Sequence, residues 1–129
     1  SFASLGVLDL GGNRFTGLIP EFLGNLTGLR MLSLSGNRFT GLIPGSLGSL
    51  YQLEFLDLSM NDLNGSLPQN LMLLSNLSTL NLSSNMFSGE IPREIGSLHG
   101  LEVLNVSHCG FSGNIPTSIG SLLRLTTLD

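Results

Sequence analysis

The chain is built from a tandem repeat of 24 residues. The pattern L-x-x-L-x-L-x-x-N opens at Leu5, Leu29, Leu53, Leu77 and Leu101, and its last copy carries Val106 and Cys109 in place of a leucine and the asparagine. The complete units span residues 5–28, 29–52, 53–76, 77–100 and 101–124, and a partial unit covers residues 125–129. Since repeats of this size bury their apolar faces against neighbouring repeats, we expect a stack of coils without a closed globular core.

An alternation of apolar and polar residues predicts one short strand in each unit. The triplets are Leu8-Asp9-Leu10, Leu32-Ser33-Leu34, Leu56-Asp57-Leu58, Leu80-Asn81-Leu82 and Leu104-Asn105-Val106. A period of two residues is typical of a half-buried strand. Because neighbouring strands lie about 4.8 Å apart, equivalent side chains of successive units should form columns.

Three further sets of residues recur at fixed positions, and we interpret all three as structural. An aromatic spine and an aliphatic column are expected in the core, and a polar ladder is expected where the chain leaves the strand, because an amide there can bond the backbone of its own and the adjacent coil. The thiol in the fifth unit is a weaker donor, so that coil should be held less tightly. The spine is Phe15, Phe39, Leu63, Phe87 and Phe111, the column is Ile19, Ile43, Leu67, Ile91 and Ile115, and the ladder is Asn13, Asn37, Asn61, Asn85 and Cys109.

The segment G-x-I/L-P follows the core pattern in every complete unit, and with it the chain resembles the plant-type leucine-rich repeats. The five copies run from Gly17 to Pro20, Gly41 to Pro44, Gly65 to Pro68, Gly89 to Pro92 and Gly113 to Pro116. The resemblance implies an α/β solenoid with a parallel sheet on the concave face and 3₁₀ or irregular segments on the convex face. Family ectodomains carry paired-cysteine caps, and Cys109 is the single cysteine. We therefore expect residues 1–129 to be one solenoid fragment without capping domains, with open ends that favour end-to-end self-association.

Composition excludes several classes of protein. The 129 residues carry a formal net charge of −4, which disfavours a nucleic-acid partner. No apolar run reaches the roughly 18 residues that a membrane span requires. His108 beside Cys109 does not indicate a nucleophile and base, because the cysteine is expected to face inward and the histidine outward. Neither residue, with His99, gives a metal-ligand spacing, so we predict no catalytic residues, no metal, no cofactor and no enzyme activity.

The outward strand positions are the candidate ligand-binding residues. One column is Val7, Met31, Phe55, Thr79 and Val103, and the other is Asp9, Ser33, Asp57, Asn81 and Asn105. Val7, Met31 and Phe55 would form an apolar stripe with a polar rim, which is typical of an interaction site. The alternative is that the stripe reflects only the strand propensity of these residues. Arg14 and Arg38 form a stacked pair of like charges that an anionic partner, or Asp62, would relieve.

Glycosylation sequons favour an extracellular chain. The motif N-x-S/T occurs at Asn25, Asn64, Asn76, Asn81 and Asn105. The last two belong to the strand pattern and are discounted, whereas Asn25 and Asn76 fall on the convex or lateral side and Asn64 remains a candidate.

The resemblance implies a recognition module rather than a catalyst. Plant-type repeats form the extracellular regions of receptor-like kinases and receptor-like proteins, which bind peptides, small molecules or co-receptor ectodomains. The alternatives are a secreted defence protein that inhibits microbial polygalacturonase and an ice-binding protein. Ice binding needs flat rows of Thr or Ser, and the series Thr16, Thr40, Ser88 and Ser112 is interrupted by Asn64.

Overall fold

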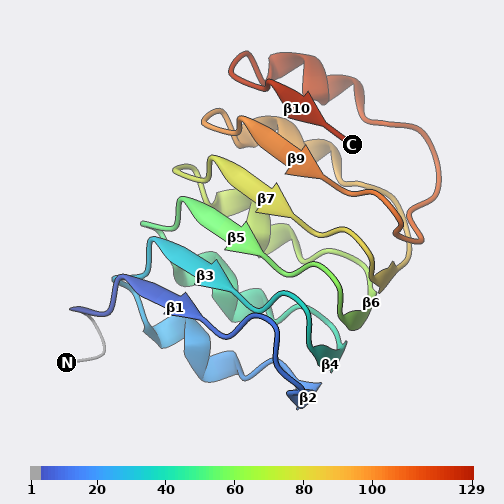
Figure 1. Cartoon of the computed structure of the whole chain (residues 1–129). Coiled ribbons are helices and arrows are strands. Elements are labelled where there is room, and N and C mark those ends of the chain that lie inside the picture. Colours follow the sequence, from blue (N-terminus) through green and yellow to red (C-terminus); the bar gives the residue numbers. More distant parts are fainter. Residues whose placement is uncertain (1–3) are drawn as a thin grey trace.

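A computed structural model describes residues 4–129 as a stack of similar coils, each with one strand on the same side (Figure 1). Residues 1–3 of the predicted solenoid lie outside the described part. The predicted sheet is confirmed, with six parallel strands in the order β1-β3-β5-β7-β9-β10. Their bounds are Val7–Asp9, Met31–Ser33, Phe55–Asp57, Thr79–Asn81, Val103–Asn105 and Thr127–Leu128. We call this the concave sheet.

Each coil closes through a short 3₁₀ helix that begins directly after the repeated proline. The helices are η2 (Glu21–Asn25), η3 (Gly45–Ser49), η4 (Gln69–Leu73), η5 (Arg93–Ser97) and η6 (Thr117–Ser121). Pro20 shows the reason: its φ of −65° suits the turn, and its carbonyl accepts a hydrogen bond from the Leu23 amide at 3.2 Å. Backbone N–H groups at the start of a helix have no partner within it, so the missing N–H of Pro20 removes no helical hydrogen bond.

A second parallel sheet, which the sequence pattern did not predict, lies between the concave sheet and the 3₁₀ helices. Its strands are β2 (Thr16–Leu18), β4 (Arg38–Gly41), β6 (Asp62–Gly65) and β8 (Met86–Phe87), in that order. In the concave sheet each residue pairs with the residue 24 positions later, as Val7 does with Met31. In the second sheet the offset is 22, so Thr16 pairs with Arg38.

The core runs the length of the stack and is filled by the repeated leucines. Leu32, Leu56, Leu80 and Leu104, the inward residues of four concave strands, have no exposed surface. Truncating one such leucine to alanine costs about 2–5 kcal/mol, so every coil contributes to the stability of its neighbours.

Most members of the aromatic spine and the aliphatic column are buried, but one terminal member of each is exposed. Phe39, Leu63 and Phe87 are buried, as are Ile19, Ile43 and Leu67. The prediction is wrong for Phe15, which is 45% exposed, and for Ile115, which is 62% exposed. Within residues 4–129 no second-sheet strand lies on the outer side of either residue. Ile19, in the same first coil as Phe15, is only 3% exposed, so an end position exposes some side chains of a coil and not others.

Candidate functional site

The concave sheet presents its candidate residues in straight columns. Val7, Met31, Phe55, Thr79 and Val103 pair directly across successive strands. Val7 is 60% exposed, and Met31 and Phe55 are half-buried. The three apolar residues are therefore contiguous on the first three strands, as the sequence predicted, and they remain accessible.

Three side chains of the second column, those of Asp57, Asn81 and Asn105, also form hydrogen bonds that the sequence pattern did not predict. Asp57 Oδ1 accepts hydrogen bonds from the Ser59 amide at 2.9 Å and the Ser59 hydroxyl at 2.6 Å. Asn81 and Asn105 make the same pair of bonds to Ser83 and Ser107. These side chains fix the backbone as it leaves the strand. These candidate ligand-binding side chains therefore also stabilise the turn that follows each strand.

Two members of this column differ from the rest. Asp9 Oδ1 accepts a hydrogen bond from the Gly11 amide at 2.9 Å, and its side chain is exposed. Ser33 is only 7% exposed. It was expected to face a ligand from the concave side, but its short side chain is buried between Asp9 and Asp57, which flank it in register.

Acidic groups dominate the charges of this face. Asp9 and Asp57 lie on the concave sheet, and Glu54 and Glu102 directly precede strands β5 and β9. Arg30 precedes β3, and its Nε lies 3.8 Å from a Glu54 carboxylate oxygen. The ion pair is exposed, so it contributes little stability and leaves both groups available to a partner.

A small polar hollow lies beside the start of these strands. Arg30, Gln52, Glu54 and Asn76 line a volume of about 350 Å³. The Asn76 amide donates to the Tyr51 carbonyl at 3.2 Å, and the Gln52 amide donates to the Tyr51 hydroxyl at 3.2 Å. These bonds hold the hollow's polar groups next to an aromatic ring.

The asparagines at the ladder position bond across neighbouring coils in the middle of the stack. Asn61 Nδ2 donates to Leu34 and Leu58 carbonyls, one in the preceding coil and one in its own, and Oδ1 accepts from the Phe39 amide at 3.1 Å. Asn37 and Asn85 repeat this arrangement. Asn13 donates only within its own coil.

Cys109 takes the ladder position without the amide's acceptor. Its Sγ donates to the Leu82 carbonyl at 3.1 Å and the Ser107 carbonyl at 3.4 Å. Burial raises the pKa of this thiol, an effect that hydrogen bonds from the backbone of Asn85 and Ser84 partly oppose. His108 is exposed, with a φ of 52°. A half-buried thiol bonded to carbonyls, beside an outward histidine, is a packing residue rather than an activated nucleophile.

The sequon asparagines fall on different parts of the surface. Asn25, Asn64 and Asn76 are exposed, at the end of η2, on β6 and in the polar hollow. Asn81 and Asn105 are half-buried on the concave sheet.

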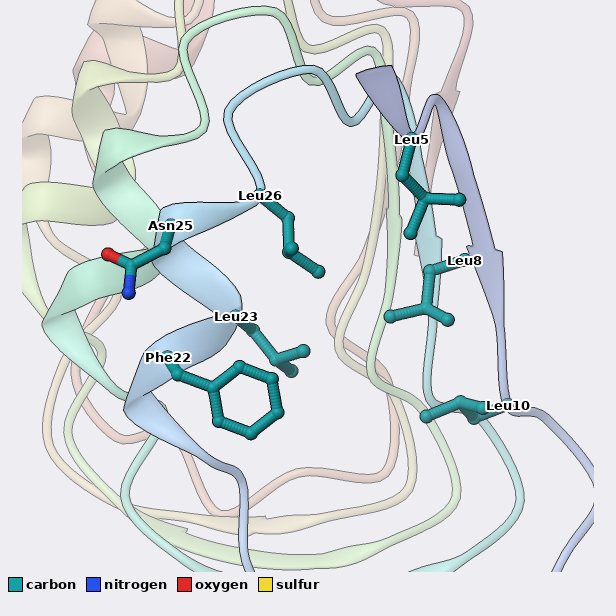
Figure 2. A pocket seen from close by; sticks show the side chains of 7 residues that line it. All are labelled: Leu5, Leu8, Leu10, Phe22, Leu23, Asn25 and Leu26. Carbon is teal, nitrogen blue, oxygen red and sulfur yellow. The ribbon is translucent and has the colours of Figure 1, made fainter. Parts of the chain in front are cut away.

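The first coil leaves the apolar interior accessible. A hollow of about 510 Å³ is lined by Leu5, Leu8, Leu10, Phe22, Leu23, Asn25 and Leu26. Figure 2 shows the apolar side chains converging on it, whereas the Asn25 amide points away.

Arg14 and Arg38 are both exposed, and between residues 4 and 129 no ion pair joins either one to Asp62. In the same part of the chain, no three His, Cys, Asp or Glu side chains are grouped as a metal site, and no helix is long and apolar enough to cross a membrane.

Comparison with known families identifies the repeat. Models described as leucine rich repeat match residues 3–63, 76–98 and 100–122. Among curated proteins none matches the chain.

Solved structures of plant receptors superpose closely. The ectodomain of the membrane receptor kinase GASSHO1/SCHENGEN3 from Arabidopsis thaliana, in complex with CASPARIAN STRIP INTEGRITY FACTOR 2, gives a TM-score of 0.93 at 44% identity, over 96% of this chain and 15% of that one. The Arabidopsis receptor kinase HAESA, in complex with the peptide hormone IDA and the co-receptor SERK1, gives 0.93 at 38% identity, over 95% and 21%. The ectodomain of the Arabidopsis receptor kinase SOBIR1 gives 0.87 at 38% identity, over 93% and 66%. The chain thus spans about a fifth or less of the length of the receptor ectodomains solved with a peptide.

Proposed function

Since the chain belongs to the leucine-rich repeat family, as a domain of the plant type, we propose that it is a recognition module whose concave sheet binds a peptide ligand or a co-receptor ectodomain at the cell surface. The observation that carries this proposal is the accessible apolar stripe of Val7, Met31 and Phe55 in register across three strands. An exposed apolar stripe with a charged rim is typical of a protein interaction site.

The acidic rim narrows the chemistry of the ligand. Asp9, Glu54 and Asp57 flank the stripe, and Arg30 is already paired with Glu54. Because complementary charge speeds encounter and suppresses wrong partners, a ligand with apolar side chains and a nearby basic group suits this face best. The resemblance to receptors solved with a peptide or a co-receptor supports the same class of partner.

The test uses peptides selected by phage display against the chain and measures their binding by calorimetry. Replacing Phe55 by serine should weaken binding about tenfold or more, because apolar anchors at the centre of an interface dominate its energy. The control is Leu42→Ser, which removes a leucine that is 60% exposed on the second-sheet side and should leave binding unchanged. If Leu42→Ser abolishes binding while Phe55→Ser does not, the concave sheet is not the binding face.

The same variants examine the defence-protein alternative. A secreted inhibitor would slow a microbial polygalacturonase in an activity assay, and Phe55→Ser would relieve that inhibition. The ice-binding alternative gains little from the second sheet, because its offset of 22 places Thr16 opposite Arg38 and Thr40 opposite Asp62. Threonines there do not form one flat row.

A further inference from the structure

The polar hollow beside the concave strands combines a sequon with groups that suit a sugar. Asn76, Leu77 and Ser78 form the sequon, and Asn76 lines the hollow with Arg30, Gln52 and Glu54. Its volume of about 350 Å³ lies at the lower end of the range for small-molecule sites. A pyranose ring offers hydroxyls to such side chains and an apolar face to an aromatic ring.

Tyr51 lies next to the hollow, because its hydroxyl accepts a hydrogen bond from Gln52, one of the four lining residues. Its side chain is 61% exposed. Its hydroxyl is held by Gln52 Nε2, and its carbonyl accepts a bond from Asn76 Nδ2. The ring, the amide side chain of Gln52 and the sequon amide are thus tied together by two hydrogen bonds before any sugar is present.

We propose that Asn76 carries an N-linked glycan whose first sugar, an N-acetylglucosamine, lies in this hollow against Tyr51. The proposal rests on the proposed function in one respect, since attachment requires passage through the secretory pathway. Attachment forms a bond from Asn76 Nδ2 to the anomeric carbon of the sugar. It breaks the bond from that carbon to the pyrophosphate of a lipid-linked oligosaccharide, which leaves with the electron pair, and Nδ2 loses one proton. The amide retains one N–H, which is enough for its bond to the Tyr51 carbonyl.

The other exposed sequons lack such surroundings. Asn25 borders the apolar hollow and directs its amide away from it (Figure 2). Asn64 lies on β6, with Met86 as its partner in the neighbouring strand. A glycan at either position would extend into solvent, so Asn25 serves as the matched control.

A seated glycan would also shape the binding face. Arg30 and Glu54, two of the four residues that line the hollow, directly precede Met31 and Phe55 of the apolar stripe. A sugar there would cover the side of the stripe where the strands begin. The ligand of the proposed function would then reach the stripe from the side where the strands end.

The test compares the chain secreted from insect cells with the same chain made in bacteria, where sequons stay unmodified. Peptide mapping by mass spectrometry reports occupancy at Asn76 and Asn25. Thermal unfolding is then measured for the parent chain, Asn76→Gln, Tyr51→Ala, the double variant and Asn25→Gln. In the secreted protein, Asn76→Gln and Tyr51→Ala should each lower the midpoint by about 3 °C, with no further loss in the double variant. In the bacterial protein this coupling should vanish, and Asn25→Gln should change neither form.

Enzymatic trimming gives a second readout. An endoglycosidase that leaves one sugar on Asn76 should preserve the midpoint, whereas an amidase that removes the whole glycan should lower it. An unoccupied Asn76, additive effects of the two substitutions, or the same coupling in the bacterial protein would each overturn the proposal. Peptide binding by Asn76→Gln separates it from the proposed function, because binding through Phe55 should survive loss of the glycan.

Discussion

Replacing Asn61 by alanine should expose how the ladder joins one coil to the next. Asn61 Nδ2 donates to the carbonyls of Leu34, Leu58 and Ser59, at 2.9, 3.2 and 3.1 Å. Each carbonyl has a second donor, from Asn37, Asn85 and the Gly36 amide respectively. The Phe39 amide bonds Asn61 Oδ1 and is buried. In the variant that N–H loses its acceptor, and an unsatisfied buried donor costs about 1–3 kcal/mol.

The three hydrogen bonds that Asn61 donates add a smaller loss, so Asn61→Ala should lower the free energy of unfolding by about 3 kcal/mol in total. For a chain of this length that lowers the thermal midpoint by about 10 °C. Circular dichroism during heating and during urea titration measures the effect. The control is Asn13→Ala: that amide is exposed and bonds only its own coil, at 2.9 and 3.1 Å, so about 0.5 kcal/mol is expected. Equal losses in the two variants would refute the claim that the ladder works between coils.

Three further predictions concern backbone conformation and the thiol. Met60 occupies the position of Gly36 with a φ of 54°, so Met60→Gly should stabilise the chain by about 1 kcal/mol in urea titration; a loss would show that the left-handed turn carries no strain. Gly41 and Gly89 have φ values of 78° and 76°, but a Cβ on Gly41 would lie 2.4 Å from a Leu18 methyl, whereas one on Gly89 meets nothing closer than 3.7 Å. Gly41→Ala should therefore lower the thermal midpoint more than Gly89→Ala, and equal shifts would count against the packing term. Because burial raises the pKa of Cys109, iodoacetamide should modify this thiol in the folded chain only at a higher pH than it modifies a free thiol. The free energy of unfolding should also fall as the pH rises from the ordinary thiol pKa through the raised one. Alkylation of the folded chain at the same pH as in urea would contradict this.

The sequence predicted features that one coil determines by itself. The triplet Leu56-Asp57-Leu58 indicates which side chains face inward, and both leucines are fully buried. A ladder asparagine such as Asn61 has a fixed place relative to the strand, where it donates to the Leu34 carbonyl. The triplet says nothing about Asp57 as a cap for Ser59, because that bond depends on the backbone path beyond the strand.

Features that depend on neighbouring coils were not predictable in the same way. The second-sheet segments, such as Thr16–Leu18, contain a glycine at φ 81° and no apolar alternation, so no strand pattern was visible. Phe15 shares its repeat position with Phe39, and only the presence of a coil on each side makes one buried and the other accessible. Left-handed backbone conformations also occur at three residues whose types do not predict them, Met60, Ser84 and His108.

The unequal registers of the two sheets determine which residues meet across neighbouring coils. On the concave side successive strands align at an offset of 24, whereas on the second side an offset of 22 slides each strand by two residues, about 6.6 Å, relative to its repeat equivalent. The concave columns therefore stay aligned from coil to coil, whereas each second-sheet strand pairs two residues out of step with the repeat. In a longer array, a partner on the concave sheet would meet equivalent residues in straight rows. A partner on the second sheet would instead meet neighbours from different repeat positions, as Thr16 lies opposite Arg38.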